Sequence, residues 1–239
     1  IQTIKNAGYE AIIINNNPET VSTDYTTSDK LYFEPLTVED VMNVVEQEKP
    51  EGVIASLGGQ TAINLAQTLT DLGVNIIGTD CAAIEKAENR DAFEKLLISL
   101  NIPQPKGKAV TRIEDGVAAA REIGYPVLVR PSFVLGGRAM AVVYDKEELV
   151  DYFREQVPEK PEHPILIDKF LEHAVEVDVD ALSDGKEVYV AGIMEHIEEA
   201  GIHSGDSACV LPSFSLSYDH VALIAAQAEA LARELQVVG

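Results

Sequence analysis

The chain has 239 residues, enough for one large domain or two small ones, and its 46% hydrophobic and 24% charged residues are ordinary for a soluble globular protein. The net charge of −22 argues against nonspecific binding to DNA or RNA, and no apolar run approaches the ~20 residues that span a bilayer. A chain this acidic holds a nucleotide only through a local cationic pocket, backbone N–H groups or metal ions. Its two cysteines, Cys81 and Cys209, fit no disulfide framework, so we expect a reducing, cytoplasmic location.

The first 80 residues alternate strand and helix signals. The predicted strands cover residues 11–14, 52–56 and 74–77, and the predicted helices cover residues 37–48 and 62–72. Thr37 is the predicted N-cap of the first of these helices. This β–α–β rhythm predicts a parallel sheet with helices on both faces.

The pattern changes after residue 100. One charged helix is predicted over residues 82–100, and residues 101–108, with two prolines and a glycine, form the clearest boundary in the chain. Beyond it the sequence predicts an α+β block with mainly hairpin connections. Its predicted helices cover residues 114–123, 146–155 and 218–235, and its predicted strands cover 127–130, 139–144, 165–168, 176–182 and 187–194.

A glycine-containing loop runs from Arg130 to Met140 between two of these strands. Gly136 and Gly137 let the backbone approach a ligand closely, and Arg130 and Arg138 bracket them with charge suited to phosphate oxygens. The alternative is a hairpin loop with a surface arginine at each end. It is not a Walker loop, because no Gly-Lys-Ser/Thr follows.

An acidic strand follows the apolar run at residues 165–167. Asp168-Lys169-Phe170-Leu171 ends that run, and Glu176 begins a segment that alternates acidic and apolar residues. A strand end offers backbone groups to a purine edge, and a carboxylate accepts from ribose hydroxyls. The alternative, which these residues favour when taken alone, is a solvated edge strand whose charges oppose aggregation.

Residues 195–209 form the densest polar stretch. The spacing of its His, Glu, Asp and Cys residues fits no zinc pattern, so no transition-metal site is predicted here. Gly201 and Gly205 around His203 and Ser204 suit a tight loop beside phosphates.

Two further features have alternative interpretations. Gly58-Gly59-Gln60-Thr61 follows a predicted strand and begins a helix, the position at which open α/β sheets bind anions. The alternative is a close turn that packs helix on strand. Arg90 is a lone arginine on a helix and, by itself, is expected to be solvated.

These segments occur together in one known order. Residues 17–24 (Asn-Pro-Glu-Thr-Val-Ser-Thr-Asp), 58–61, 130–138 and 195–207 resemble the large-subunit family of carbamoyl phosphate synthetases, and the likeness runs from about residue 5 to the end of the chain. In that family two homologous halves each contain a Rossmann-like preATP-grasp domain followed by an ATP-grasp domain. One half phosphorylates bicarbonate and the other carbamate. Segments 18–24 and 135–140 resemble the carbamate half.

The resemblance implies a fold class of α/β and α+β. We expect a Rossmann-like preATP-grasp domain, incomplete at its N-terminus, followed by an ATP-grasp domain, incomplete at its C-terminus. The expected boundaries are 1–84 for the preATP-grasp domain, 85–124 for a helical linker region, 125–211 for the ATP-grasp N-terminal subdomain and 212–239 for the start of the C-terminal subdomain.

The resemblance also implies an ATP site. The residues it assigns are Arg90, Arg130, Gly136, Gly137 and Arg138 for the phosphates, Lys169 and Leu171 for the adenine edge through their backbone, Glu176 for the ribose, and Gly201, Ile202, His203 and Ser204 for the pocket lining. It assigns no catalytic residue. The family's Mg²⁺ or Mn²⁺ ligands are expected beyond Gly239, so the chain is expected to be a fragment that is inactive alone.

The whole enzyme is expected to make carbamoyl phosphate from small-molecule substrates, for pyrimidine and arginine synthesis. Its implied partners are a glutamine-amidotransferase small subunit and the twin synthetase half, with no nucleic acid and no membrane. The competing hypotheses are the bicarbonate half, another ATP-grasp carboxylase or ligase, and a non-catalytic nucleotide-binding module.

Overall fold

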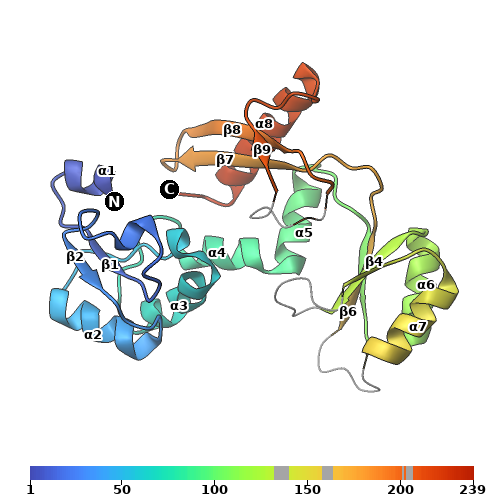
Figure 1. Cartoon of the computed structure of the whole chain (residues 1–239), viewed down its shortest axis with the longest axis horizontal. Helices are drawn as coiled ribbons and strands as arrows, with labels where there is room; N and C mark the ends of the chain where they lie inside the picture. The colour runs from blue at the N-terminus through green and yellow to red at the C-terminus, as the bar shows by residue number, and fades with distance from the viewer. Residues whose placement is uncertain (132–139, 158–163, 201, 203–206) are drawn as a thin grey trace. The chain divides into compact units, whose positions relative to one another are not determined.

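A computed structural model of the chain describes residues 1–131, 140–157, 164–200, 202 and 207–239 (Figure 1). The chain divides into two compact units. The first comprises residues 1–96, 180–191 and 222–239, and the second comprises residues 97–179 and 192–221.

Parallel strands form the centre of the first unit. Strand β1 (Ile12–Ile14) pairs in parallel with β2 (Lys30–Tyr32), which confirms the predicted parallel arrangement. The strands predicted over residues 52–56 and 74–77 are reduced to a single parallel bridge between Val53 and Ile76. The ladder stops there because the chain turns at Ser56 into a 3-10 helix, η2 (Ser56–Gly58).

The helices in this part of the chain are α1 (Gln2–Asn6), α2 (Val38–Glu48), α3 (Gly59–Asp71), α4 (Cys81–Glu88) and α5 (Arg90–Ser99), with a second 3-10 helix, η1 (Val21–Thr23). The last three residues of α5 belong to the second unit. Thr37 caps α2 as predicted, because its Oγ1 accepts the amide N–H of Asp40 at 3.2 Å. The core of this unit joins Val41 of α2, Leu69 of α3 and Val74.

The single helix predicted over residues 82–100 is interrupted at Asn89. The backbone of Asn89 is extended, and its Oδ1 accepts the amide N–H of Ala92 at 3.1 Å. Asparagine is a favoured N-cap, so Asn89 ends α4 and begins α5.

An antiparallel sheet forms the centre of the second unit. Its strands are β3 (Gly107–Val110), β4 (Val127–Pro131), β5 (Ala141–Val143) and β6 (Ile165–Lys169), in the order β3-β6-β4-β5. Strand β3 begins at the end of the segment interpreted as a boundary, residues 101–108. Three of its four residues are exposed at the sheet edge, so its sequence has no alternation that predicts a strand.

Helices α6 (Ile113–Ile123) and α7 (Lys146–Gln156) cover one face of this sheet (Figure 1). The core beneath them includes Val127, Val129, Leu149 and Ile167, all fully buried. Gly116 permits the close approach of α6, because a Cβ there would meet the ring of Phe153 at 3.0 Å.

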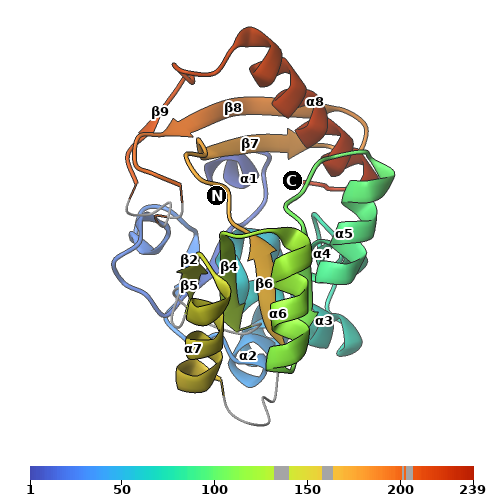
Figure 2. The same cartoon turned by 90° about the vertical axis from the view of Figure 1, so that its right-hand side faces the viewer.

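A second antiparallel sheet has the order β7-β8-β9, with β7 (Val177–Ser183), β8 (Val188–His196) and β9 (Cys209–Val210) (Figure 2). Strands β7 and β8 contribute residues to both units. The turn between them is closed by Asp184, whose Oδ1 accepts the amide N–H groups of Lys186 and Glu187 at 2.8 and 2.7 Å.

Helix α8 (Tyr218–Glu234) has no buried residue. Val221, Ile224, Ala228 and Leu231, which are spaced to form an apolar stripe along this helix, are only partly covered. Among the described residues, no helix combines the length and apolar composition needed to cross a membrane.

Candidate functional site

Arg130 lies near the end of β4, immediately before the glycine-containing loop. The register pairs Leu128 with Asp168 and Arg130 with Leu166, so Arg130 and Asp168 are diagonal neighbours on one face of the sheet. Nε and Nη2 of Arg130 both donate to Oδ2 of Asp168 at 3.3 Å. The Arg130 side chain is still 42% exposed, against 15% for Asp168. The carboxylate therefore orients a guanidinium that keeps access to solvent.

Lys169 lies on the opposite, core-facing side of β6. Its Nζ donates to the carbonyl oxygens of Gly124 and Tyr125 at 3.0 Å each, at the end of α6. An ammonium group is favoured at a helix C-terminus, where carbonyl groups lack partners within the helix. The amide N–H of Lys169 donates to the carbonyl of Lys106 at 2.7 Å. The side chain and the amide N–H of Lys169 thus both make hydrogen bonds that stabilise the fold.

The chain between β6 and β7 carries two more of the residues assigned by resemblance. Leu171 has an exposed side chain, and Glu176 directly precedes β7, where its carbonyl accepts the amide N–H of His196 at 3.0 Å. Asp168, Lys169, Leu171 and Glu176 therefore lie along one continuous segment that links the two antiparallel sheets.

Two carboxylates, Glu195 within β8 and Glu198 just after it, accept hydrogen bonds from residues later in the chain. Glu195 accepts the amide N–H groups of Phe214 and Ser215 at 3.0 Å each and the Ser215 hydroxyl. That hydroxyl, followed by the two amides, lowers the pKa of Glu195. Glu198 accepts the Ser207 hydroxyl at 2.8 Å and the amide N–H of Ala208 at 2.6 Å, and these contacts lower its pKa. Both residues are held in their charged form by donors that come later in the chain.

One cluster combines residues that the sequence patterns left separate. His196 Nε2 lies 3.0 Å from Oδ2 of Asp178, and His196 pairs directly with Cys209 in the register of β8 and β9. The spacing argument considered only residues 195–209, and Asp178 comes from another strand. Strand register, which the sequence does not reveal, brings the three together.

The remaining assigned residues are placed as follows. Arg90 is the first residue of α5, in the first unit, and Ile202 is exposed in the second. Gly58 is the N-cap of α3 and Gly59 its first residue, and Gly59 has a φ of +66°, a conformation that favours glycine. Six assigned residues lie outside the described residues: Gly136, Gly137, Arg138, Gly201, His203 and Ser204.

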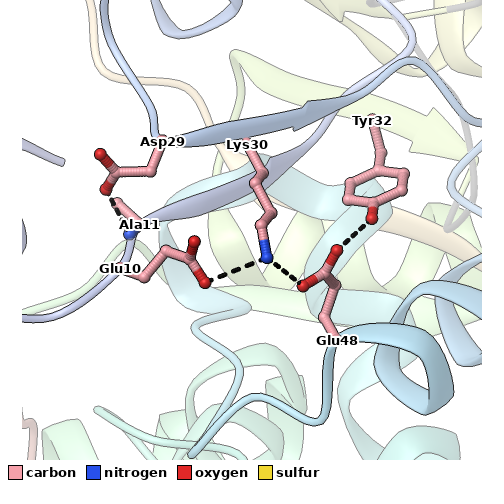
Figure 3. Close-up of polar contacts among 6 residues, drawn as sticks. All are labelled: Glu10, Ala11, Asp29, Lys30, Tyr32 and Glu48. Atoms are coloured by element: carbon pink, nitrogen blue, oxygen red, sulfur yellow. Dashed lines mark hydrogen bonds and ion pairs between the residues drawn. The ribbon is translucent and has the colours of Figure 1, made fainter.

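The first unit has a polar cluster that the sequence patterns did not single out (Figure 3). Lys30 of β2 contacts Glu48 at the end of α2 at 2.6 Å and Glu10 at 3.2 Å, and Tyr32 donates to Glu48. The carboxylate of Glu48, with that of Glu10, raises the pKa of Lys30, and the Lys30 ammonium lowers the pKa of Glu48. The cluster ties strand to helix and leaves no cation directed to a ligand among its members.

Comparison with solved structures defines the class of protein. The chain is similar to the biotin carboxylase domain of the Hydrogenobacter thermophilus 2-oxoglutarate carboxylase, solved with MgADP, ADP and bicarbonate. The TM-score is 0.75 and the identity 20%, and the match covers 100% of this chain and 55% of that one. A likeness at this identity shows the fold alone, which is that of ATP-grasp proteins with their preceding α/β domain.

Comparison with sequence families shows to which family the chain belongs. The family described as carbamoyl phosphate synthase preATP-grasp domain matches residues 1–86, and the one described as carbamoyl-phosphate synthase L chain, ATP binding domain, matches residues 89–239. The chain belongs to the carbamoyl-phosphate synthase large-chain family.

Two curated relatives carry the name carbamoyl phosphate synthase large chain. The one from Methanothermobacter thermautotrophicus is 60% identical over 232 residues and the one from Archaeoglobus fulgidus 58% identical over 237 residues. These matches cover 97% and 99% of this chain, and the chain spans 22% of the length of each relative.

Proposed function

We propose that this chain provides the ATP-binding part of a carbamoyl phosphate synthetase large subunit, in the half that phosphorylates carbamate. The observation that carries the proposal is the position of Arg130 at the end of β4, oriented by Asp168 and partly open to solvent. A guanidinium is well suited to phosphate oxygens, because it presents several N–H donors in one plane. In a chain with this large net negative charge, a local cation is one of the groups that can hold a polyphosphate ligand, besides backbone N–H groups and metal ions.

We propose that the nucleoside part of ATP binds along the segment from Asp168 to Glu176. Since the amide of Lys169 is used within the sheet, any adenine contact from this residue comes from its carbonyl oxygen, which accepts from an amino group. The backbone of Leu171 is proposed to complete the contact, and Glu176 to accept from the ribose hydroxyls. Arg90, Gly136, Gly137, Arg138, Gly201, Ile202, His203 and Ser204 remain proposed ATP-binding residues on the resemblance alone.

The divalent cation stays part of the proposal. A bound Mg²⁺ or Mn²⁺ neutralises charge on the phosphoryl group during transfer. On the resemblance alone, we propose that the ligands of this cation are not among the 239 residues of this chain, and we expect the chain to be inactive alone.

We propose four further properties of the protein. They are the domain boundaries at residues 84, 124 and 211, the glutamine-amidotransferase small subunit and twin synthetase half as partners, a cytoplasmic location, and a role in pyrimidine and arginine synthesis. The support for them is the family membership of the chain.

The first experiment tests the phosphate contact. In a large chain of the relatives' length, Arg130→Ala should raise the Mg-ATP requirement by about tenfold to a hundredfold, since a hydrogen bond to a charged group contributes ~1.5–3 kcal/mol. Arg112→Ala is the matched control, because Arg112 is an exposed arginine of the same unit that pairs with Asp115 at 2.8 Å. Equal effects of the two variants would refute the assignment.

The second experiment separates the two halves. If the carbamate assignment is right, Arg130→Ala should impair ATP synthesis from carbamoyl phosphate and ADP while bicarbonate-dependent ATP hydrolysis continues. Segments 18–24 and 135–140 support this choice. Loss of the hydrolysis alone would assign the chain to the bicarbonate half. Loss of neither reaction would favour a non-catalytic nucleotide-binding module.

A further inference from the structure

Three metal-ligating side chains from three neighbouring strands meet in the second unit. Asp178 lies on β7, His196 on β8 and Cys209 on β9, and one ligand atom from each lies within 4.8 Å of the others. The strands run side by side in the order β7-β8-β9 (Figure 2). Because His196 and Cys209 are direct partners in the register, their side chains project from the same face of the sheet. The fold itself therefore fixes the proximity of these groups.

The distances between the three ligand atoms suit a cation with tetrahedral coordination after small side-chain movements. With Zn–N and Zn–O bonds of about 2.0–2.2 Å and a Zn–S bond of about 2.3 Å, a tetrahedral site separates N from O by roughly 3.3 Å and N from S by roughly 3.6 Å. The N–O separation is 3.0 Å here, and no separation within the cluster exceeds 4.8 Å. Closure therefore requires movements of about 1 Å.

The burial of the three side chains shows which ones can move. His196 is 1% exposed and is held by the surrounding structure, whereas the Asp178 side chain is 47% exposed and Cys209 is exposed. One ligand is thus fixed and two can adjust by rotation. The exposed side of the cluster also gives water access to a fourth coordination position, which is the arrangement of open zinc sites.

The donor types select the class of cation. An imidazole nitrogen, a thiolate sulfur and a carboxylate oxygen together favour borderline cations such as zinc. Magnesium and calcium prefer oxygen ligands, so the cluster discriminates against the cation of the proposed nucleotide site. Binding would replace the hydrogen bond between Asp178 and His196 by two bonds to the metal.

We propose that Asp178, His196 and Cys209 form a binding site for one zinc-class divalent cation, with water as the fourth ligand. The site shares no residue with the proposed ATP contacts, so either proposal can fail without the other. A cation held there links β7, β8 and β9, and a ligand that binds only the folded state stabilises it.

Cobalt(II) is the probe, because thiolate coordination gives it a near-ultraviolet charge-transfer band. The 239-residue chain, which contains all three ligands, is titrated with Co²⁺ in the presence of excess Mg²⁺. We expect a band that saturates at one equivalent and disappears when Zn²⁺ is added. We also expect Zn²⁺, but not Mg²⁺, to raise the thermal unfolding midpoint.

Variants identify the ligands. Cys209→Ser should abolish the band, and Cys81→Ser is the matched control that should retain it, since the Cys81 sulfur lies beside Thr70 in the first unit. Asp178→Asn, at a half-exposed position, should weaken Co²⁺ binding by roughly tenfold or more. Absence of the band in the folded parent chain, its survival in Cys209→Ser, or its loss in Cys81→Ser would overturn the proposal. Circular dichroism of each variant shows whether a lost band reflects a lost ligand or a lost fold.

Discussion

Glu195 is a buried carboxylate that accepts hydrogen bonds from uncharged donors. It is 2% exposed, and its oxygens accept two amide N–H groups and one hydroxyl from residues 214–215. A carboxylate with this many donors is favoured in its charged form despite burial. The residue therefore ties the end of β8 to the segment that leads into α8.

Replacing Glu195 by Gln should make stability less dependent on pH. The pKa of Glu195 is lowered in the folded state, so its charge stabilises the fold above the ordinary value of 4.5 and that contribution is lost as pH falls through the lowered pKa. Urea unfolding at pH 7 should show the variant to be less stable, and the difference should shrink below about pH 4. A difference that stays constant with pH would show that packing, not charge, is responsible.

Asp168 should act on ATP use through the orientation of Arg130. In a chain of the relatives' length, Asp168→Asn keeps an acceptor but loses its charge, so we expect KM for ATP to rise by about threefold to tenfold, with a smaller change in kcat. Asp151→Asn is the control, because Asp151 pairs with an exposed arginine, Arg154, at 3.5 Å on α7. A KM that does not move would remove Asp168 from the site.

At the scale of elements, capping chemistry decides where helices begin. The Thr37 hydroxyl satisfies one of the amide groups at the start of α2 that lack a partner within the helix. Thr37→Ala should lower the free energy of unfolding by about 1 kcal/mol, whereas Thr37→Ser should have little effect. Chemical denaturation of the two variants provides the comparison, and equal stabilities would argue that α2 is held by packing alone.

Long periodic elements were predictable, whereas some of the short or edge strands were not. Helices α2, α6, α7 and α8 begin and end within one or two residues of the predictions because their apolar periodicity spans several turns. Strands β2 and β3 were missed, since three residues and an exposed edge leave little pattern. The break at Asn89 was missed because the charged periodicity continues across the cap.

One part of the candidate site was likewise accessible to prediction from the sequence, and another part was not. Arg130 was assigned from its place in a recognisable segment, whereas Asp168 was not assigned to the site, and the strand register brings the two side chains together. The Asp178, His196 and Cys209 cluster could not be predicted from spacing, because 18 residues separate its first two members and pairing across strands is a tertiary property. The roles of the assigned ATP-binding residues stay predictions.

At the scale of the whole molecule, net charge should govern the response to salt. The chain has 40 acidic and 18 basic residues, so repulsion among carboxylates outweighs the pairs that Lys30 and other cations form. Raising NaCl from low concentration to about 0.15 M shortens the screening length to about 8 Å and should raise the thermal unfolding midpoint. A midpoint that falls instead would show that ion-pair clusters dominate the electrostatics.

The contacts of Lys169 have a consequence for natural and engineered variation. Its side chain satisfies two carbonyl groups at the end of α6, while its proposed contact with adenine comes from the backbone. In a saturation mutagenesis survey, tolerance at position 169 should therefore follow the capacity to donate hydrogen bonds. Arginine should be accepted, whereas leucine and glutamate should reduce the yield of folded protein without changing the ATP affinity of the molecules that fold. Selection for nucleotide binding would then act on the backbone of Lys169, and selection for folding would act on its side chain.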